Sequence, residues 1–205
     1  MQISHIEEVD KKRRKVFIDG NEAFTLYSNE IYKYRLEKDT LVSLALYEEI
    51  MAVLNKRAKL KVMDYLKQSD KTEKELRVKL RRAHFTDISI DVAIEYVKNF
   101  GYLDDVRYTL NYIRLKKGSK SKQVIEFELK NKGIDSAVIK ESMDQEYGRD
   151  SELTAIKKLI EKKCNDINKL DNEKKTKLIA SMCRKGFSYE NIRKCMAIME
   201  ENNEY

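Results

Sequence analysis

Apolar residues recur in one pattern three times along the chain. Each copy is centred on an apolar residue, at Phe85, Ile134 and Phe187, with further apolar residues nine and five positions before it and five and nine positions after it. Residues four apart lie on one face of a helix, so the pattern predicts a helix on each side of the central residue. The central residues are 49 and 53 positions apart, which fits a three-helix repeat. The aligned apolar positions are Leu76, Ile125 and Leu178; Leu80, Leu129 and Met182; Ile90, Ile139 and Ile192; and Ile94, Met143 and Met196.

The residue just before each central position predicts where the second helix of the repeat ends. Gly133 and Gly186 stand there in two copies, and glycine ends a helix at low cost by adopting a left-handed backbone. His84 occupies the same place in the first copy, so we interpret it as a helix cap rather than a catalytic residue.

The middle copy is the clearest. Its first helix is predicted over residues 105–117, after which Gly118 and the serines beside it break the helix. A second helix carries Val124, Ile125, Phe127 and Leu129 to Lys132, and residues 134–136 open the third.

The outer copies carry their own signals. Thr72 and Glu75 form a capping box that starts the second helix of the first copy, after a first helix with Leu60, Met63 and Leu66 on its inner face. In the third copy we expect helices over 154–164, 174–184 and 188–200, a polar loop over 166–173 and a frayed tail over 200–205.

The N-terminal part is different and predicts short strands over 3–9, 15–18 and 22–26. Asp19-Gly20 is a strong two-residue hairpin signal, and the basic run 10–15 is expected to be a loop.

Two helices are predicted to follow these strands. Ser28 should cap a short helix over 29–34, with Ile31 and Tyr32 as its packing residues. A long helix should open at Asp39 or Thr40 and carry Leu41, Leu44, Tyr47, Ile50, Met51 and Leu54 on one stripe; the chain has no proline, so a break near 55–58 stays open.

The predicted fold is therefore mainly α: tandem three-helix repeats forming an elongated curved array, with a small N-terminal β-hairpin. The expected domains are residues 1–57, 58–104, 105–150 and 151–205.

Composition places the chain in a reducing compartment. It has no apolar run long enough to span a membrane and no apolar stretch after Met1 that would form a signal peptide, so we expect a cytoplasmic protein. Cys164, Cys183 and Cys195 are odd in number and lack a C-x-x-C spacing, which favours free thiols over bridges.

The net charge of +7 is unevenly distributed. Residues 56–82 hold eleven basic and four acidic residues, residues 107–132 hold eight and two, and residues 135–152 reverse this with two and six. Basic blocks in successive repeats favour an anionic partner, such as nucleic acid or a nucleoprotein. The alternative is that lysine-rich helix faces are simply solvated.

No pattern supports catalysis, a metal or a cofactor. His5 and His84 are too far apart for a helical zinc pair, and Lys117-Gly118-Ser119 lacks the leading glycine of a phosphate loop. Asp104-Asp105 at a helix start is typical of a cap, and no histidine is placed to activate Cys183.

The candidate contact surface is instead basic and aromatic. Tyr108 and Tyr112 are neighbours on one helix face, and aromatic rings among cations suit nucleic acid or an acidic protein groove. For Tyr112 we favour a core position with its hydroxyl at the edge. The candidate contact residues are Arg77, Arg81, Arg82, Arg107, Tyr108, Arg114, Lys117, Lys120, Lys122, Lys130 and Lys132.

Three stretches resemble one known family. Residues 100–108, read with Tyr112, Ile113 and Gly118, residues 125–134, and the T-E-K-E-L-R stretch at 72–82 are similar in order and turn residues to the RecX family of recombination regulators. The resemblance covers roughly residues 60–199. The chain departs from the family at His84, where glycine is expected, and in the loop at Gly118, which carries serine where members often have Pro and Arg.

This resemblance implies a non-enzymatic, monomeric modulator of RecA, the recombinase that polymerises on single-stranded DNA. Family members are elongated helical arrays that lie in the groove of the RecA–DNA filament, hinder strand exchange and ATP hydrolysis, and favour disassembly or block extension. The expected partners are thus the RecA filament and single- or double-stranded DNA, with no membrane. Two alternatives stay open: a basic helical protein that competes for single-stranded DNA without touching RecA, and a structural scaffold.

Overall fold

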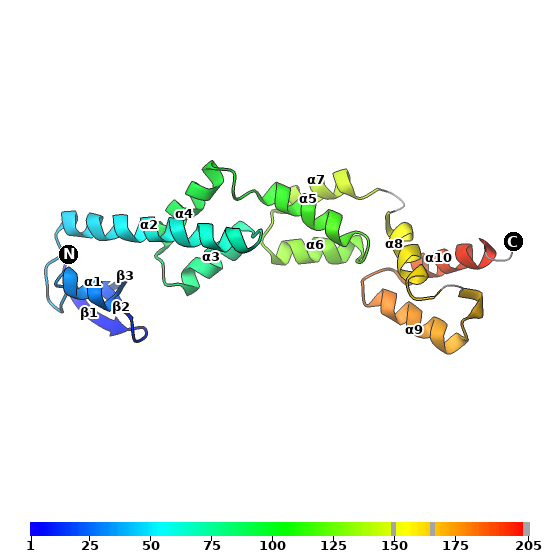
Figure 1. Cartoon of the computed structure of the whole chain (residues 1–205), viewed down its shortest axis with the longest axis horizontal. Coiled ribbons are helices and arrows are strands. Elements are labelled where there is room, and N and C mark those ends of the chain that lie inside the picture. Colours follow the sequence, from blue (N-terminus) through cyan, green and yellow to red (C-terminus); the bar gives the residue numbers. More distant parts are fainter. Residues whose placement is uncertain (149–150, 165–166, 203–205) are drawn as a thin grey trace. The chain divides into compact units, whose positions relative to one another are not determined.

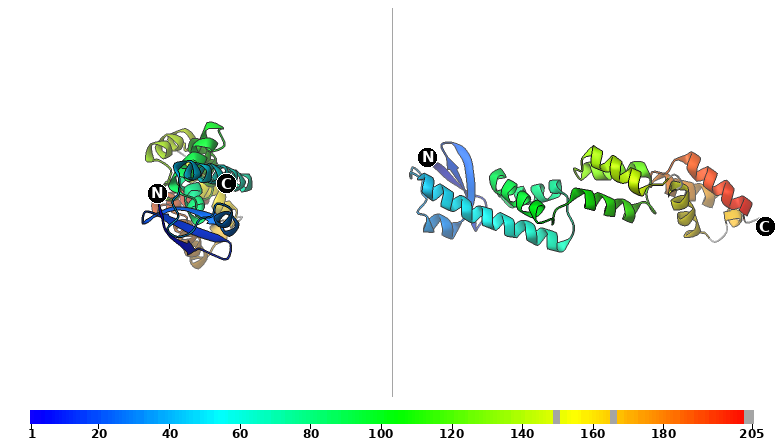
Figure 2. Two further views of the ribbon diagram at one scale, coloured as in Figure 1. Left: turned by 90° about the vertical axis from the view of Figure 1, so that its left-hand side faces the viewer. Right: turned by 90° about the horizontal axis from the view of Figure 1, so that it is seen from above.

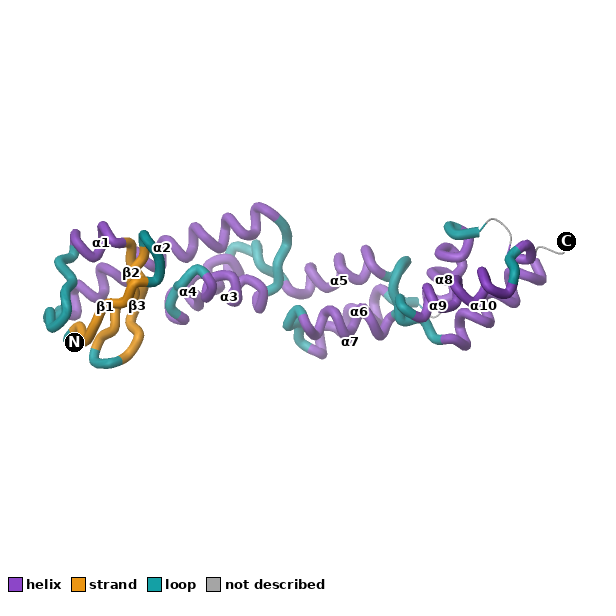
Figure 3. The backbone as a smooth tube through the Cα atoms, turned by 90° about the horizontal axis from the view of Figure 1, so that it is seen from below, coloured by secondary structure: helices purple, strands orange, loops and turns teal. Residues whose placement is uncertain are grey.

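The computed structural model describes residues 1–148, 151–164 and 167–202, and the chain divides into two compact units, Met1–Asp104 and Asp105–Tyr205 (Figure 1). The first unit contains a small sheet and four helices, α1 to α4. The described part of the second unit is helical throughout, and short loops join its helices (Figure 3).

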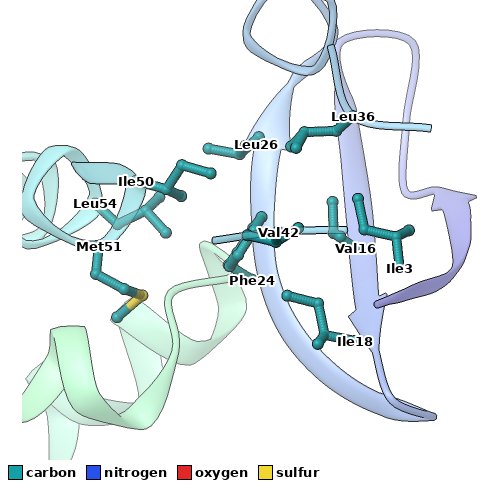
Figure 4. Close-up of a cluster of buried hydrophobic side chains, with 10 residues drawn as sticks. All are labelled: Ile3, Val16, Ile18, Phe24, Leu26, Leu36, Val42, Ile50, Met51 and Leu54. Atoms are coloured by element: carbon teal, nitrogen blue, oxygen red, sulfur yellow. The ribbon is translucent and has the colours of Figure 1, made fainter. Parts of the chain in front are cut away.

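The sheet has three antiparallel strands in the order β1-β2-β3: Ile3–Glu8, Arg13–Ile18 and Asn21–Tyr27. It lies beside the N-terminal half of α2 (Figure 2). Asp19 and Gly20 form the tight turn between β2 and β3 with φ of 48° and 83°, as the Asp-Gly pair predicts. Apolar side chains from the sheet and from α2 share one core, which includes Val16, Phe24, Leu26, Ile50 and Leu54 (Figure 4).

The predicted basic loop over 10–15 is wrong in its second half. Arg13 and Lys15 belong to β2, where they pair with Tyr27 and Thr25 of β3. The start of this strand is not recognisable in the sequence, because its first three residues are basic and only Val16 and Ile18 belong to the buried core.

The short helix α1 (Ser28–Lys33) begins one residue earlier than predicted, and Ser28 does not cap it. The N-cap residue is Tyr27, whose backbone N–H donates to the Glu30 carboxylate at 2.9 Å, while the Ser28 hydroxyl donates to the Lys12 carbonyl. Ile31 packs on the core as expected, but Tyr32 is 87% exposed, so its predicted packing role is wrong.

Helix α2 (Leu44–Gln68) is one continuous helix of 25 residues capped by Ser43. The predicted start at Asp39 or Thr40 is wrong: Asp39 has a left-handed backbone, and Leu41 is 76% exposed. The break near 55–58 does not occur.

The inner face predicted for the second half of α2 is confirmed at Met63 and Leu66, which pack against the core of the first repeat, and is wrong at Leu60. Ala58 and Val62 are buried in the core of the first repeat, while Leu60 is 60% exposed. Because Ala58 is small, it contributes little to a hydrophobic pattern, and Leu60 was mistaken for the inner face.

Helices α3 (Glu73–Arg82) and α4 (Asp87–Asn99) complete the first repeat with α2. The predicted capping box is confirmed: the Thr72 hydroxyl accepts from Glu75 N at 3.3 Å, and Thr72 N donates to the Glu75 carboxylate at 3.1 Å. His84 ends α3 with φ of +64°, which confirms its role at the helix end.

The second unit contains two further repeats. The first is formed by α5 (Asp105–Lys116), α6 (Lys122–Asn131) and α7 (Ser136–Glu146). The other is formed by α8 (Ser151–Glu161), the short 3-10 turn η1 (Ile167–Lys169), α9 (Asn172–Cys183) and α10 (Tyr189–Asn202).

The helices of the third repeat lie close to their predicted positions, but α8 begins and ends three residues early. The predicted polar loop contains η1, and its first residue, Asp166, lies outside the described residues. Of the tail predicted to fray over 200–205, residues 203–205 lie outside the described residues, whereas α10 continues through Asn202. Cys164, Cys183 and Cys195 are free, as expected.

Burial confirms the repeat pattern. All of the aligned helix positions are buried, and the central residues Ile134 and Phe187 are also buried, whereas Phe85 is only half-buried. The three cores are separate clusters, and the sheet has a fourth.

Candidate functional site

A cluster of two tyrosines and two lysines lies on α5 and at the C-terminal end of α6 in the middle repeat. The rings of Tyr108 and Tyr112 stack with centroids 6.1 Å apart and planes 16° apart. The ammonium group of Lys132 lies 5.5 Å from the Tyr108 ring centroid and 5.7 Å from that of Tyr112, and Lys116 lies 5.9 Å from the latter. The structure thus brings the predicted Tyr108 and Lys132 together in cation–π contact.

Glu128 joins this cluster through its carboxylate. It accepts from the Tyr112 hydroxyl at 2.8 Å and forms an ion pair with the predicted contact residue Lys120. Burial opposes ionisation of Glu128, but the bonds from Lys120 and Tyr112 outweigh it, so the pKa of this carboxyl lies below its ordinary value. Burial and the neighbouring Glu128 raise the pKa of Tyr112 to about 12.

Tyr112 therefore has the position that the sequence favoured. Its ring packs against the core of the middle repeat, and its hydroxyl is bonded at the edge. Both tyrosines are half-buried, so their rings form the edge of the core rather than a projecting platform.

Two further predicted cations are paired with one carboxylate. Arg114 binds Glu146 through Nε at 2.8 Å and Nη2 at 2.6 Å, and Lys117 lies 3.2 Å from the other oxygen. The Arg114 bond is the main reason that the pKa of Glu146 lies below its ordinary value. Glu146 belongs to the acidic segment 135–152, so part of that segment neutralises the basic block inside the same repeat.

Lys122 lies where the middle repeat meets the third. Its backbone N–H donates to Glu152 at 3.0 Å, and the other Glu152 oxygen accepts from Asn191 of α10, also at 3.0 Å. The Lys122 ammonium group is 4.0 Å from Glu126. In the structure, Lys122 therefore helps to join the middle repeat to the third repeat.

Arg107 and Lys130 remain on the surface of the middle repeat. Both are exposed, and within the described residues Lys130 forms no ion pair. Lys130 is close in the sequence to Phe127, a large apolar side chain that is 64% exposed.

The predicted arginines of the first unit differ in their acidic partners. Hydrogen bonds to Asp91 at 2.6 Å and to Glu73 at 2.7 Å raise the pKa of Arg77. Arg81 bonds to Asp87 at 3.0 Å. Arg82 is exposed and has no carboxylate partner in the part of the chain that the structure describes.

The acidic partners Glu128, Glu146 and Glu73 were not identified from the sequence. Glu73 is four residues from Arg77, a spacing that signals a helical ion pair. Glu146 is 32 residues from Arg114, so only the fold places the two together.

The residues considered for catalysis lie apart. His5 stacks on Phe17 with ring centroids 4.0 Å apart, whereas His84 lies at the end of α3. Within residues 1–148, 151–164 and 167–202, no group of three histidine, cysteine or acidic side chains could hold a metal ion. Over the same ranges, no helix is both long and apolar enough to cross a membrane.

Comparison with known proteins matches each repeat to a family model. The first, second and third three-helix domains of RecX match residues 58–96, 104–143 and 150–196, respectively. The regulatory protein RecX of Clostridium acetobutylicum is 31% identical over 98% of both chains, and that of Clostridium perfringens is 30% identical over all of this chain and 98% of its own.

Two solved structures share the fold. A crystal structure of regulatory protein RecX covers 94% of this chain and 98% of its own, with a TM-score of 0.58 and 24% identity. RecX from Lactobacillus salivarius covers 73% of this chain and 98% of its own, with a TM-score of 0.61 and 24% identity. With three matched domains and full-length relatives, the chain belongs to the RecX family of regulatory proteins, which are not enzymes.

Proposed function

We propose that this protein binds the RecA–single-stranded DNA filament and lowers its strand-exchange and ATPase activity. Membership of the RecX family supports the proposal, as do the exposed cations that have no carboxylate partner within the described residues. The filament is an anionic surface of protein and phosphate, which such cations would complement.

The observation that carries the proposal is a surface that recurs on the second helix of each repeat. Val78 of α3 is exposed seven residues before Phe85, and Phe127 of α6 is exposed seven residues before Ile134. An exposed cation follows three residues later: Lys130, or Arg81, which is paired with Asp87 at 3.0 Å. Residues three apart share a helix face, so each surface combines an apolar side chain with a positive charge.

The third repeat has a weaker version of this surface. Ala180 of α9 takes the place of the large apolar residue, and Arg184 is exposed four residues later, as Arg82 is in the first repeat. Aromatic side chains and arginine are enriched at protein interfaces, so an exposed apolar side chain bordered by a positive charge fits such an interface. We name these three helix faces the repeated basic face: Val78, Arg81, Arg82, Phe127, Lys130, Ala180 and Arg184.

The test measures ATP hydrolysis by RecA on single-stranded DNA while this protein is added well below one molecule per nucleotide. Inhibition at these ratios, including on filaments formed beforehand, is the expected result. Inhibition only when the protein is added first, in amounts that coat the DNA, would instead identify a competitor for single strands. Binding to naked DNA would then fall steeply with salt, since each neutralised phosphate releases counterions.

A pair of substitutions tests the repeated basic face directly. Phe127→Ala with Lys130→Glu should weaken inhibition at least tenfold, since it removes both the apolar contact and the charge. The matched control is Lys140→Glu, an exposed lysine of α7 in the same repeat. Equal inhibition by the double variant and by Lys140→Glu would reject this face as the contact surface.

A further inference from the structure

A cavity of about 300 Å³ lies in the first unit, where β3, α2 and the turn between α3 and α4 meet. Leu26 and Leu54 of the sheet–helix core line it, and Figure 4 shows these two side chains on facing elements. Its volume is at the lower end of the range for small-ligand sites.

A buried hydroxyl group in this cavity has no partner. Thr25 lines the cavity and is only 6% exposed, yet its hydroxyl oxygen makes no hydrogen bond in the part of the chain that the structure describes. Burying a polar group without a partner costs folding free energy, so such groups are rare in native proteins. The hydroxyl oxygen is closed to solvent, so a ligand acceptor reaches it only when the Thr25 side chain turns toward the cavity.

Three cations surround the same cavity, and no carboxylate lines it. Arg57 is paired with Glu30 and lies 4.7 Å from the ring of Tyr27, and Arg13 is paired with Asp10 at 2.6 Å. Lys61 has no carboxylate partner among the described residues and lies 5.2 Å from the ring of Tyr65. The ligand should therefore carry a negative charge.

His84 is a second residue at this cavity whose conformation costs folding free energy. It lies in the left-handed region with φ of +64°, where the other two repeats have glycine, and its side chain lines the cavity. A residue with a Cβ is strained there, so the repeat itself shows that glycine would suit the turn better. The unpartnered Thr25 hydroxyl and the strained His84 backbone thus occur at one cavity. Such local violations of folding preferences are typical of functional sites.

The aromatic residues decide the kind of anion. The rings of Tyr27, Tyr65 and His84 line the cavity together with the cations. The ammonium group of Lys79 also lies 5.2 Å from the centroid of the Tyr65 ring. Rings for base stacking among cations for phosphate are the features of single-stranded nucleic acid sites. A carboxylate ligand would use the cations but not the rings.

We propose that this cavity binds one nucleotide of a single DNA strand. Lys61 and His84 donate to its phosphate, Thr25 donates once its side chain turns toward the ligand, Arg57 adds positive charge, and the base packs on Tyr27 or Tyr65. None of the residues that line this site belongs to the repeated basic face, so substitutions can test the two surfaces separately.

The histidines provide the test, because the chain has only two. We would titrate the full chain with a thymidine tetranucleotide and follow the imidazole C–H signals by NMR. The signals of His84 should move and those of His5, stacked on Phe17, should not. Unmoved His84 signals would overturn the proposal.

Two substitutions separate binding from folding. Thr25→Val removes the unpartnered hydroxyl with little change of shape, and His84→Gly relieves the backbone, so neither should lower the thermal midpoint. Each should weaken tetranucleotide binding about tenfold, the effect of losing one hydrogen bond to a charged group. For His84→Gly, which removes the reporter, binding is followed by fluorescence anisotropy of a labelled tetranucleotide. Wild-type binding by both variants would overturn the proposal.

A matched charge control and two other ligands complete the experiment. Lys61→Ala should reduce the shift of the His84 signals severalfold, whereas Lys56→Ala, an exposed lysine of the same helix that does not line the cavity, should leave it intact. Thymidine monophosphate that bound as tightly as the tetranucleotide would reject a strand in favour of a free nucleotide. A poly-glutamate peptide that moved the His84 signals equally would reject the nucleotide altogether.

Discussion

Gly186 lies so close to Ser121 that a Cβ on the glycine would come within 2.5 Å of the serine hydroxyl oxygen. Ser121 caps α6 of the middle repeat, and Gly186 ends the second helix of the third repeat, so this contact joins consecutive repeats. The backbone N–H of Ser121 also donates to the Lys185 carbonyl at 3.1 Å. Gly186 is therefore required for two reasons: its left-handed φ of +86° and the space that it leaves for its neighbour.

Replacing Gly186 by alanine should destabilise the second unit. The new Cβ would also lie 2.3 Å from Cγ2 of Val124, so α6 and the turn before α10 would have to separate. We expect a loss of about 2–4 kcal/mol, combining overpacking with left-handed strain. Denaturant unfolding followed by circular dichroism measures this loss.

Gly101→Ala is the control for the backbone contribution. Gly101 has a φ of +67°, but a Cβ there would meet nothing within 4 Å, so only about 1 kcal/mol should be lost. Equal losses for the two variants would mean that the close approach of Gly186 to Ser121 is unimportant.

Thr72→Ala should destabilise the first repeat by about 1–2 kcal/mol. Thr72 is fully buried, and its hydroxyl is the acceptor for the first turn of α3. Thr72→Ser keeps the hydroxyl and should recover most of the loss. Native-state hydrogen exchange at the Glu75 amide reports on the cap directly, and unchanged exchange in Thr72→Ala would contradict it.

The repeats were predictable because each carries a local signal. Thr72 and Glu75 define a helix start within four residues, and Gly133 and Gly186 define helix ends at single positions. The apolar residues around Ile134 are four or five apart, so helical periodicity alone places them in a core.

The long helix and the ion pairs were less predictable, each for its own reason. Helix α2 serves two cores through one stripe that includes Leu54, Ala58 and Val62, but the small Ala58 weakens the apolar signal where the first core ends and the second begins. Arg114 was correctly placed in a basic helix, but its partner Glu146 comes from another helix, and sequence spacing does not encode such a tertiary pair. Charge blocks therefore overstate how much of the positive charge is available to a partner.

The ion pairs of Glu73 predict an acid-sensitive contribution to stability. Burial raises the pKa of this carboxyl, but hydrogen bonds from Lys98 at 2.6 Å and Arg77 at 2.7 Å outweigh it, so the folded pKa lies below the ordinary 4.5. A lowered folded pKa means that the unfolded chain binds the proton more tightly. The stabilisation is thus complete above about pH 4.5 and is lost as the pH falls through the folded pKa.

Glu73→Gln should accordingly cost up to about 1 kcal/mol at neutral pH, since the pair is partly solvated. The difference from wild type should disappear in acid, as measured by urea unfolding between neutral pH and pH of about 3. Glu95→Gln removes the same charge from an exposed position of α4 and should show a smaller, nearly flat difference. A constant Glu73→Gln difference across this range would argue against the ion pairs.

Tyr112→Phe tests whether this tyrosine belongs to the core or to a contact surface. The substitution keeps the ring stacked on Tyr108 but removes the hydroxyl that donates to Glu128 at 2.8 Å. A loss of about 0.5–1.5 kcal/mol is expected, with RecA inhibition unchanged. A normal stability with weaker inhibition would place the hydroxyl in the partner interface instead.

Alkaline titration checks the same hydrogen bond in the wild-type protein. The folded pKa of Tyr112 is raised from the ordinary 10 to about 12, so its contribution to stability is complete below pH 10 and is lost as the pH rises through about 12. The pKa of Tyr147 is also raised to about 12, so tyrosinate absorbance of the folded protein should lack two early-titrating rings. Glu128→Gln should lower the pKa of Tyr112 only, because it removes the negative charge that repels tyrosinate. If Glu128→Gln leaves the titration curve unchanged, burial alone sets the pKa of Tyr112 and the bond to Glu128 has little energetic weight.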